Sequence, residues 1–125
     1  MSSASQRERV FEHVQDVYSA EPEYLWMKYP NSAVFRHPMS RKWFALMMDI
    51  PRSRLGLPGE EIVYVLVVKC DPLLIGALLS EPGFFPAYHM NKSQWVSVLL
   101  DGPVPDERIL PLLAMSYDSV SLKKK

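Results

Sequence analysis

Apolar residues recur at helical spacing near the start of the chain. Val10, Val14 and Val17 form one stripe, and Ser5 stands before it with Glu8 three positions later. A serine followed at that spacing by a glutamate is a capping box, in which each side chain bonds the other residue's backbone amide. The pattern predicts an amphipathic helix that begins after Ser5 and packs one face on a core.

A second helical stripe lies near the end of the chain. Its inward positions are predicted to be Ile109, Leu112, Leu113 and Ser116. Pro111 interrupts this stripe. A proline inside a helix removes one backbone hydrogen bond and clashes with the preceding turn, at a cost of about 3 kcal/mol. We therefore expect either a kink at Pro111 or a helix that starts late.

Several stretches between these helices have the alternation or the apolar, β-branched character of strands. They are residues 33–37, 42–50, 62–69 and 94–100, with a shorter candidate at 85–89. The first two are separated by a short turn and predict a β-hairpin, and the third predicts a central strand. In the second strand, alternation would place Phe44 with Leu46 on one face and Trp43 with Met47 on the other.

Asp71 and Pro72 predict the start of a further helix, because aspartate caps free amides and proline suits the first helical position. Its inward residues are predicted to be Leu73, Leu74, Ala77 and Leu78. The elements then follow the order helix, three strands, helix, strand, helix. We expect an α+β fold, with an antiparallel sheet and helices packed mainly on one face. A compact single domain would span residues 1–120, and the basic tail 121–125 would be disordered.

Composition and charge narrow the function classes only mildly. The chain has 125 residues, 48 % of them hydrophobic, and 14 basic against 14 acidic side chains. A dedicated nucleic-acid binder is usually basic, so zero net charge argues against that role. The distribution is uneven, however. Residues 24–100 hold eight basic and five acidic side chains, whereas residues 1–23 hold two basic and five acidic ones.

The chain has the features of a cytoplasmic protein. Cys70 is its single cysteine, so no internal disulfide can form, and its N-terminus is polar and charged. Its longest apolar run is far too short to cross a bilayer. We expect a monomer without membrane contact.

The stretch from Ala87 to Val98 brings several polar side chains close together. In a structural interpretation, Asn91 forms a turn and Trp95 starts the next strand with its ring in the core. In a functional interpretation, the same stretch is a ligand-binding corner at a strand end, where Lys92 meets an anion. The residues of this candidate corner are Tyr88, His89, Asn91, Lys92 and Trp95.

Basic residues concentrate in two loops. Arg36, Arg41 and Lys42 flank the predicted hairpin turn, and Arg52 and Arg54 lie in the long loop that follows the second strand. If both loops project to one side, they present a cationic surface that suits a phosphate backbone. The other interpretation is a pair of ordinary solvated loops.

Catalytic and metal signatures are missing from the sequence. Cys70 ends a strand before a helix, but no histidine neighbours it, so we interpret it as a buried, inert thiol. Glu8, Glu12 and Asp16 share one helix face, which we interpret as solvated rather than metal-binding. We expect no cofactor and no metal. An enzyme that uses His89 or Cys70 is the least favoured hypothesis.

The chain resembles the MmcQ/YjbR family over roughly residues 24–120. The matching stretches are "AVFRHPMSRKWFALM", "VVKCDPLLIGALL", "GFFPAYHMNKSQWVSVLLDGPVPDE" and "SYDSV", in the family's order and spacing. The resemblance implies a compact α+β fold similar to the frataxin-like, or CyaY-like, fold. It also implies DNA binding, because two projecting loops of the family resemble a double wing. The loop "DIPRSRLGLPGEE" is longer here than in shorter family members.

These observations lead to one functional expectation and one alternative. The chain is expected to bind double-stranded DNA weakly and without base specificity, and to carry out no catalysis. The phosphate-contacting residues would be Arg36, Arg41, Lys42, Arg52, Arg54 and Lys92. The alternative is a protein- or metabolite-binding module that uses the corner around His89 and Lys92.

Overall fold

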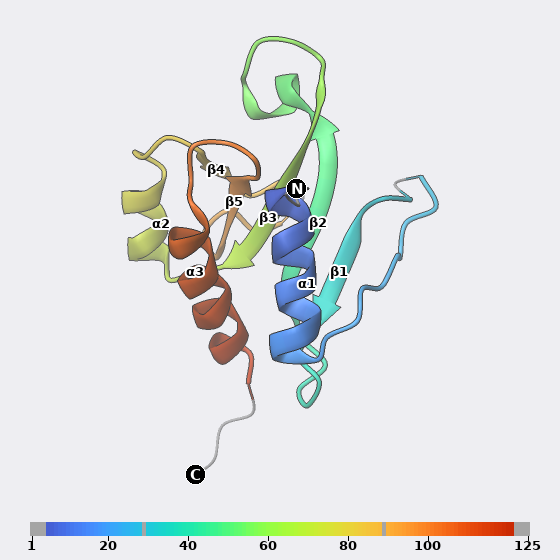
Figure 1. Cartoon of the computed structure of the whole chain (residues 1–125). Helices are drawn as coiled ribbons and strands as arrows, with labels where there is room; N and C mark the ends of the chain where they lie inside the picture. Colours follow the sequence, from blue (N-terminus) through green and yellow to red (C-terminus); the bar gives the residue numbers. More distant parts are fainter. Residues whose placement is uncertain (1–4, 29, 89, 122–125) are drawn as a thin grey trace.

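The molecule is built on one antiparallel sheet with the strand order β1-β2-β3-β5-β4 (Figure 1). The structure is a computed structural model and describes residues 5–28, 30–88 and 90–121. The strands are β1 (Ala33–Arg36), β2 (Trp43–Pro51), β3 (Ile62–Lys69), β4 (Phe84–Pro86) and β5 (Trp95–Leu99). The helices are α1 (Gln6–Tyr18), α2 (Pro72–Leu78) and α3 (Asp106–Ser119), with a short 3₁₀ helix, η1 (Arg52–Leu55). The predicted α+β fold is therefore confirmed, with β3 at the centre of the sheet.

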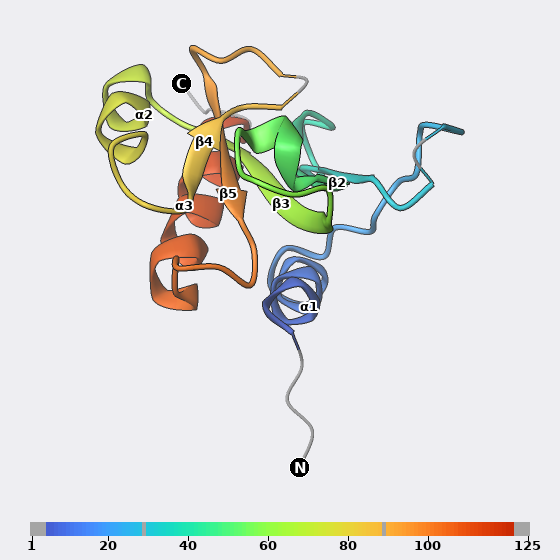
Figure 2. The same ribbon diagram turned by 90° about the horizontal axis from the view of Figure 1, so that it is seen from above.

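The helices cover one face of the sheet and form the larger core with it. α1 and α3 lie side by side on this face, and α2 packs beside β5 (Figures 1 and 2). Val10 and Val14 from α1 and Ile109 and Leu113 from α3 are buried there. The capping box of Ser5 and the Asp71 cap are both present, so local sequence signals start α1 and α2 as predicted.

Loops rather than helices cover the opposite face. A second cluster there buries Leu46, Met48, Val65, Val67 and Trp95. Side chains from three loops pack against it, namely Trp26, Leu55, Tyr88 and Met90. The sheet is therefore buried on both faces, which explains why its central strands are apolar almost throughout.

A β-bulge at the start of β2 changes the predicted facing of its side chains. Phe35 pairs with Ala45 and Arg36 with Trp43, so Phe44 has no partner on β1. Phe44 consequently lies in the helix-side core, and Trp43 lies with Leu46 on the loop side. The prediction that Phe44 shares a face with Leu46 is wrong, because strict alternation assumes regular pairing.

Three helix predictions also need correction. Val17, predicted in the inward stripe of α1, is 58 % exposed, because only Val10 and Val14 of that stripe reach the core. α3 runs from Asp106 to Ser119 with Pro111 inside it, so the late start is wrong. Its predicted inner residues are all buried. In α2, Leu73 is 87 % exposed and Ala77 is exposed too, whereas Ile75 and Leu78 are buried. The tail predicted at 121–125 falls outside the described residues except for Ser121, whose amide bonds the Asp118 carbonyl.

Both edges of the sheet are partly blocked against pairing with a further strand. Glu23 lies against the outer side of β1, where its amide and carbonyl each bond Val34 at 2.9 Å. At the other edge, β4 has three residues and ends in Pro86, which has no amide hydrogen to donate.

Candidate functional site

The turn between β1 and β2 is held in shape by a buried histidine. The backbone amide of His37 bonds the Lys42 carbonyl at 2.8 Å. Its Nδ1 accepts hydrogen bonds from the amides of Met39 at 3.0 Å and Ser40 at 3.3 Å. An accepting Nδ1 carries no hydrogen, so the neutral ring carries it on Nε2. The ring also stacks on Tyr117 of α3, with ring centroids 4.3 Å apart.

Two arginines meet one glutamate beside this turn. Arg36 Nε lies 3.0 and 3.1 Å from the two carboxylate oxygens of Glu23, and Arg41 Nη2 lies 3.6 Å from the second of them. Arg36 also donates to the Arg41 carbonyl at 3.0 Å. Arg41 has a φ of +65°, which is uncommon outside glycine and persists only where the surroundings fix the backbone.

We name the group of Arg36, Arg41 and Lys42 the basic tip. It holds three cationic side chains against the Glu23 carboxylate and the Glu21 carboxylate that lines the same small cavity, which leaves one positive charge in excess. The side chain of Arg41 is 65 % exposed, and Lys42 is exposed as well. The basic tip therefore presents positive charge on a rigid turn, which is the arrangement that favours anion binding.

The arginines of the β2–β3 loop lie far from the basic tip. The nine residues of β2 lie between the two groups, and at roughly 3.3 Å per residue this amounts to about 26 Å (Figure 1). Arg52 Nε bonds the Pro58 carbonyl at 3.0 Å, so this side chain holds the loop together. The exposed Glu60 and Glu61 balance the charge of Arg52 and Arg54. The six basic candidates thus do not form one surface.

The β4–β5 loop reaches the β2–β3 loop on the helix-free face. Arg54 Nη1 lies 3.4 Å from the Tyr88 hydroxyl. Asn91 Oδ1 accepts from the amide of Ser93 at 2.9 Å, and its own carbonyl accepts from Trp95 at 3.0 Å. This confirms the structural interpretation of Asn91 as a turn residue.

Part of the candidate ligand corner therefore has a structural role instead of facing a ligand. Trp95 is buried in the loop-side core, as the structural interpretation predicts. Lys92 is exposed, and Tyr88 is half-buried. His89 lies outside the described residues.

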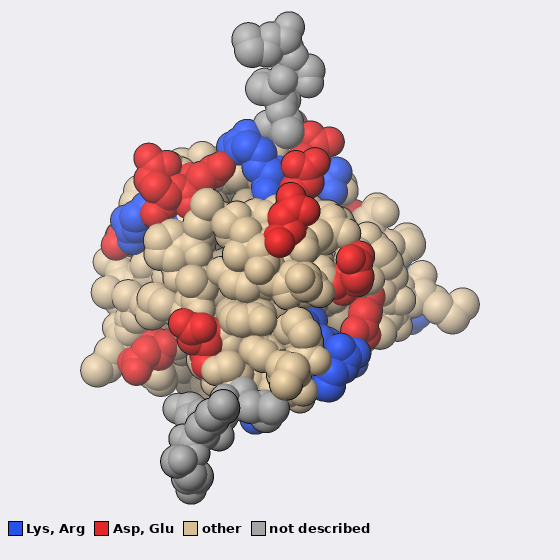
Figure 3. All heavy atoms as spheres, turned by 60° about the horizontal axis from the view of Figure 1, so that its bottom comes forward, with Lys and Arg blue, Asp and Glu red and all other residues tan. Residues whose placement is uncertain are grey.

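Charges of both signs alternate over the helix-bearing side and its lower end. Figure 3 shows separate groups of Lys and Arg side chains among Asp and Glu side chains, around a broad uncharged area. Among the described residues, no group of three or more His, Cys, Asp or Glu side chains could hold a metal ion. No helix in the described part of the chain combines the length and the apolar character needed to cross a membrane.

Cys70 is buried, and its environment strongly favours the neutral thiol over the thiolate. Burial raises the pKa of this thiol to about 11, and the neighbouring Asp71 carboxylate adds to the effect. A nucleophilic cysteine needs a lowered pKa instead. This agrees with the interpretation of Cys70 as inert.

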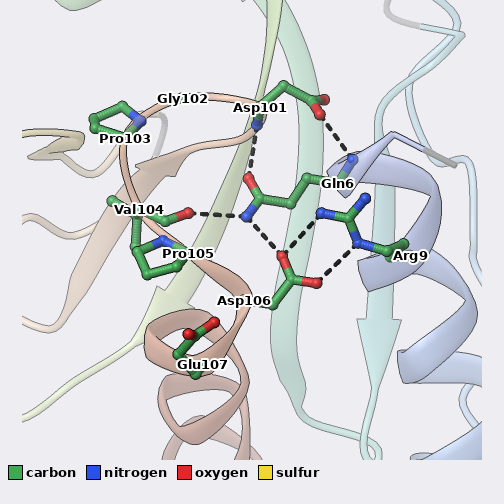
Figure 4. Close-up of a pocket in the computed structure, with 9 residues that line it drawn as sticks. All are labelled: Gln6, Arg9, Asp101, Gly102, Pro103, Val104, Pro105, Asp106 and Glu107. Atoms are coloured by element: carbon green, nitrogen blue, oxygen red, sulfur yellow. Dashed lines mark hydrogen bonds and ion pairs between the residues drawn. The ribbon is translucent and has the colours of Figure 1, made fainter. Parts of the chain in front are cut away.

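Sequence reasoning missed a polar network that joins α1 to the loop before α3 (Figure 4). The Gln6 side chain is buried and donates to the Val104 carbonyl and to Asp106 Oδ1, both at 2.8 Å, while its oxygen accepts from the Asp101 amide at 2.7 Å. Arg9 adds an ion pair to Asp106 at 2.9 Å. We name these residues the α1–α3 clamp. A glutamine at the first position of an amphipathic helix is its only local signal.

The bonds within the α1–α3 clamp give it a structural role. The hydrogen bond from Arg9, followed by the one from Gln6, lowers the pKa of Asp106 to about 2. A cavity of about 570 Å³ opens beside these residues, and Gln6 and Arg9 both donate to the Asp106 carboxylate there (Figure 4). The clamp fixes how α1 sits against α3.

Comparisons with known proteins agree with this fold. The family model YjbR matches residues 15–119. The uncharacterized protein YyaQ of Bacillus subtilis (strain 168) is 37 % identical over 111 residues, which are 89 % of this chain and 94 % of that protein.

Solved structures give the same result. The crystal structure of a Pseudomonas syringae protein superimposes with a TM-score of 0.89 and 41 % identity, over 92 % of this chain and 98 % of that one. A solution NMR structure from Pseudomonas syringae gives a TM-score of 0.85 at 40 % identity, over 95 % of each chain. Protein DR2400 of Deinococcus radiodurans shares the fold, with a TM-score of 0.68 at 24 % identity over 90 % of this chain and 76 % of that one. The chain belongs to the YjbR family.

Proposed function

We propose that this protein binds the phosphate backbone of nucleic acid weakly, without reading the base sequence, and that the basic tip makes the main contacts. The observation that carries the proposal is the excess of positive charge on a turn whose backbone is fixed by His37. Phosphate contacts depend on cationic side chains and carry no sequence information. Duplex DNA is the expected ligand because of the family resemblance described above.

The members of the basic tip have different roles in this proposal. Arg41 and Lys42 are exposed and would contact phosphate oxygens. Arg36 would act as a positioning residue, because it bonds Glu23 and the Arg41 carbonyl. A rigid turn loses little conformational entropy on binding, which favours affinity at a small surface.

The remaining basic candidates would contribute less. Arg54 and Lys92 are exposed on the helix-free face and would add long-range attraction. Arg52 is bonded to the Pro58 carbonyl and lies near Glu61, so its loss would loosen the loop more than it would weaken binding.

Fluorescence anisotropy with a labelled duplex tests the proposal. Binding would be measured at about 50 and about 200 mM salt, since each neutralised phosphate adds about 0.9 to the slope of log affinity against log salt. We expect Arg41→Ala/Lys42→Ala to reduce that slope by about 1.8. Arg54→Ala/Lys92→Ala removes the same charge from the other loops and is the matched control.

Two results would count against the proposal. If wild type shows no binding at low salt, the protein is not a nucleic-acid binder of this kind. If both double variants lower the slope equally, the contacts are not centred on the basic tip.

A further inference from the structure

The His37 ring acts in the β1–β2 turn as a hydrogen-bond acceptor, a role that only the neutral imidazole can fill. Its Nδ1 accepts from the amides of Met39 at 3.0 Å and Ser40 at 3.3 Å, and the residue is 5 % exposed. A protonated imidazole carries a hydrogen on both nitrogens and accepts at neither. Turning the ring over does not restore the acceptor, because the other nitrogen is a donor as well. The turn in this conformation therefore excludes the protonated ring.

The shape of the turn depends on this acceptor. Two backbone bonds close the base of the turn: the Arg41 amide bonds the His37 carbonyl at 2.9 Å, and the His37 amide bonds the Lys42 carbonyl at 2.8 Å. Nδ1 fixes the amides of Met39 and Ser40 between these bonds. Arg41 has a φ of +65°, a conformation that persists only where neighbouring groups enforce it. Loss of the acceptor would therefore release the tip of the turn while its base stays closed.

The charged groups around His37 nearly balance one another. Tyr117 of α3 lies against the ring, and Tyr18 of α1 lies on Tyr117 with His13 at its edge. The last turn of α3 adds partial negative charge beside Tyr117, which favours a cation. A positive charge on the ring is thus tolerated here, and the two hydrogen bonds to Nδ1 decide which form the turn holds. Among the described residues, the charged side chains of the turn and of the elements packed against it are Arg36, Arg41, Lys42, Glu21, Glu23 and Asp118.

We propose that protonation of His37 switches the β1–β2 turn from this closed form to a form that releases the amides of Met39 and Ser40. The closed form excludes the proton and the released form accepts it, so a falling pH favours release. An imidazole in water takes up its proton at about pH 6.5, so release begins below about that pH. The fold thus contains a pH-sensitive device in the turn that carries the basic tip.

This inference goes beyond the proposed function and does not rest on it. It has one consequence for that function, because Arg41 would lose its fixed backbone while the basic tip keeps all its charges. Acid would therefore change the arrangement of the phosphate-contacting side chains without removing any of them.

Hydrogen exchange of the Met39 and Ser40 amides, followed by NMR between about pH 8 and about pH 5, tests the proposal. Each rate is divided by the rate of an unstructured peptide at the same pH, so that only the protection by the turn remains. His13→Asn/His89→Asn leaves His37 as the single histidine of the chain. In this variant we expect the protection of both amides to fall below about pH 6.5, by up to about tenfold for each pH unit, because one proton is taken up on release.

His37→Asn in the same background is the matched variant. Its side-chain oxygen offers an acceptor near the position of Nδ1 but does not titrate, so protection of Met39 and Ser40 should stay constant over the same pH range. The amide of Val67, in the central strand β3, reports unfolding of the whole protein and should stay protected in both variants. The nitrogen chemical shifts of the His37 ring at neutral pH should show the hydrogen on Nε2.

Three results would overturn the proposal. One is a hydrogen on Nδ1 at neutral pH, since the ring would then be no acceptor. Another is protection of Met39 and Ser40 that stays constant down to about pH 5 while His37 is the only histidine. The third is an equal loss of protection in the His37→Asn variant, which would assign the pH dependence to another group. No measurement here contains nucleic acid, so failure leaves the anisotropy test of the proposed function intact.

Discussion

At the scale of single residues, His37 determines the shape of the turn that carries the basic tip. His37→Ala would leave the amides of Met39 and Ser40 without their acceptor and would remove the ring that lies on Tyr117. Leaving a buried donor unsatisfied costs about 1–3 kcal/mol, and these two amides are partly buried, so we expect a loss of about 1 kcal/mol in the free energy of unfolding by urea. His37→Asn retains an acceptor near the position of Nδ1 and should restore part of the loss. Equal stability of wild type and His37→Ala would show that the turn keeps its shape without the His37 side chain.

Residue roles that depend on near neighbours were predictable from the sequence. The caps at Ser5 and Asp71 and the turn at Asn91 each need partners two or three positions away, and each is confirmed. The role of Gln6 was not predictable, because its partners Asp101 and Val104 come about a hundred residues later. Phe44 was assigned to the wrong face because a bulge depends on the pairing of two strands.

At the scale of elements, the α1–α3 clamp makes the stability of the folded protein depend on pH. The pKa of Asp106 is about 2 in the folded protein, below its ordinary value of 3.8. A carboxylate whose pKa is lowered by folding stabilises the folded protein at pH values above its ordinary pKa. This stabilisation is lost as the pH falls through the pKa of the folded state. We expect Asp106→Asn to destabilise the protein at neutral pH and to differ little from wild type near pH 2. Glu107→Gln is the control, since it removes a carboxylate from the same turn of α3.

The second element-scale prediction concerns Pro111, which lies inside α3 and is exposed. It has no amide hydrogen to donate to the Glu107 carbonyl. We expect Pro111→Ala to stabilise the protein by about 1–2 kcal/mol, because the cost of an interior proline of about 3 kcal/mol is partly offset by its restriction of the unfolded chain. Pro105→Ala, at the N-cap of the same helix, should not stabilise. Destabilisation by Pro111→Ala would mean that the proline ring makes a favourable contact.

At the scale of the whole molecule, charge is separated between the helices and the rest of the chain. α1 and α3 hold six acidic and three basic side chains, which gives them a net charge of −3, so the remainder carries +3 in a chain of zero net charge. Lys123, Lys124 and Lys125, which lie outside the described residues, account for this +3, so the described remainder is neutral and the positive charge of the basic tip is a local excess. The DNA measurement tests that local excess.

Fold and family were predictable at this scale, whereas the grouping of basic residues was not. The order of helices and strands follows from local patterns. Whether Arg41 and Arg52 share a surface depends on the length and direction of β2, which places them at opposite ends. A resemblance between loop sequences does not give the distance between the two loops.

The bridge between Glu23 and Val34 also affects how the protein behaves when many copies are crowded together. An open sheet edge is a template on which another chain can add a strand, and this is how ordered aggregates grow. Glu23 occupies that template at Val34 on β1, and Pro86 shortens it on β4. Growth of the sheet from copy to copy is thereby hindered at both edges, which disfavours fibril formation when many copies are crowded together.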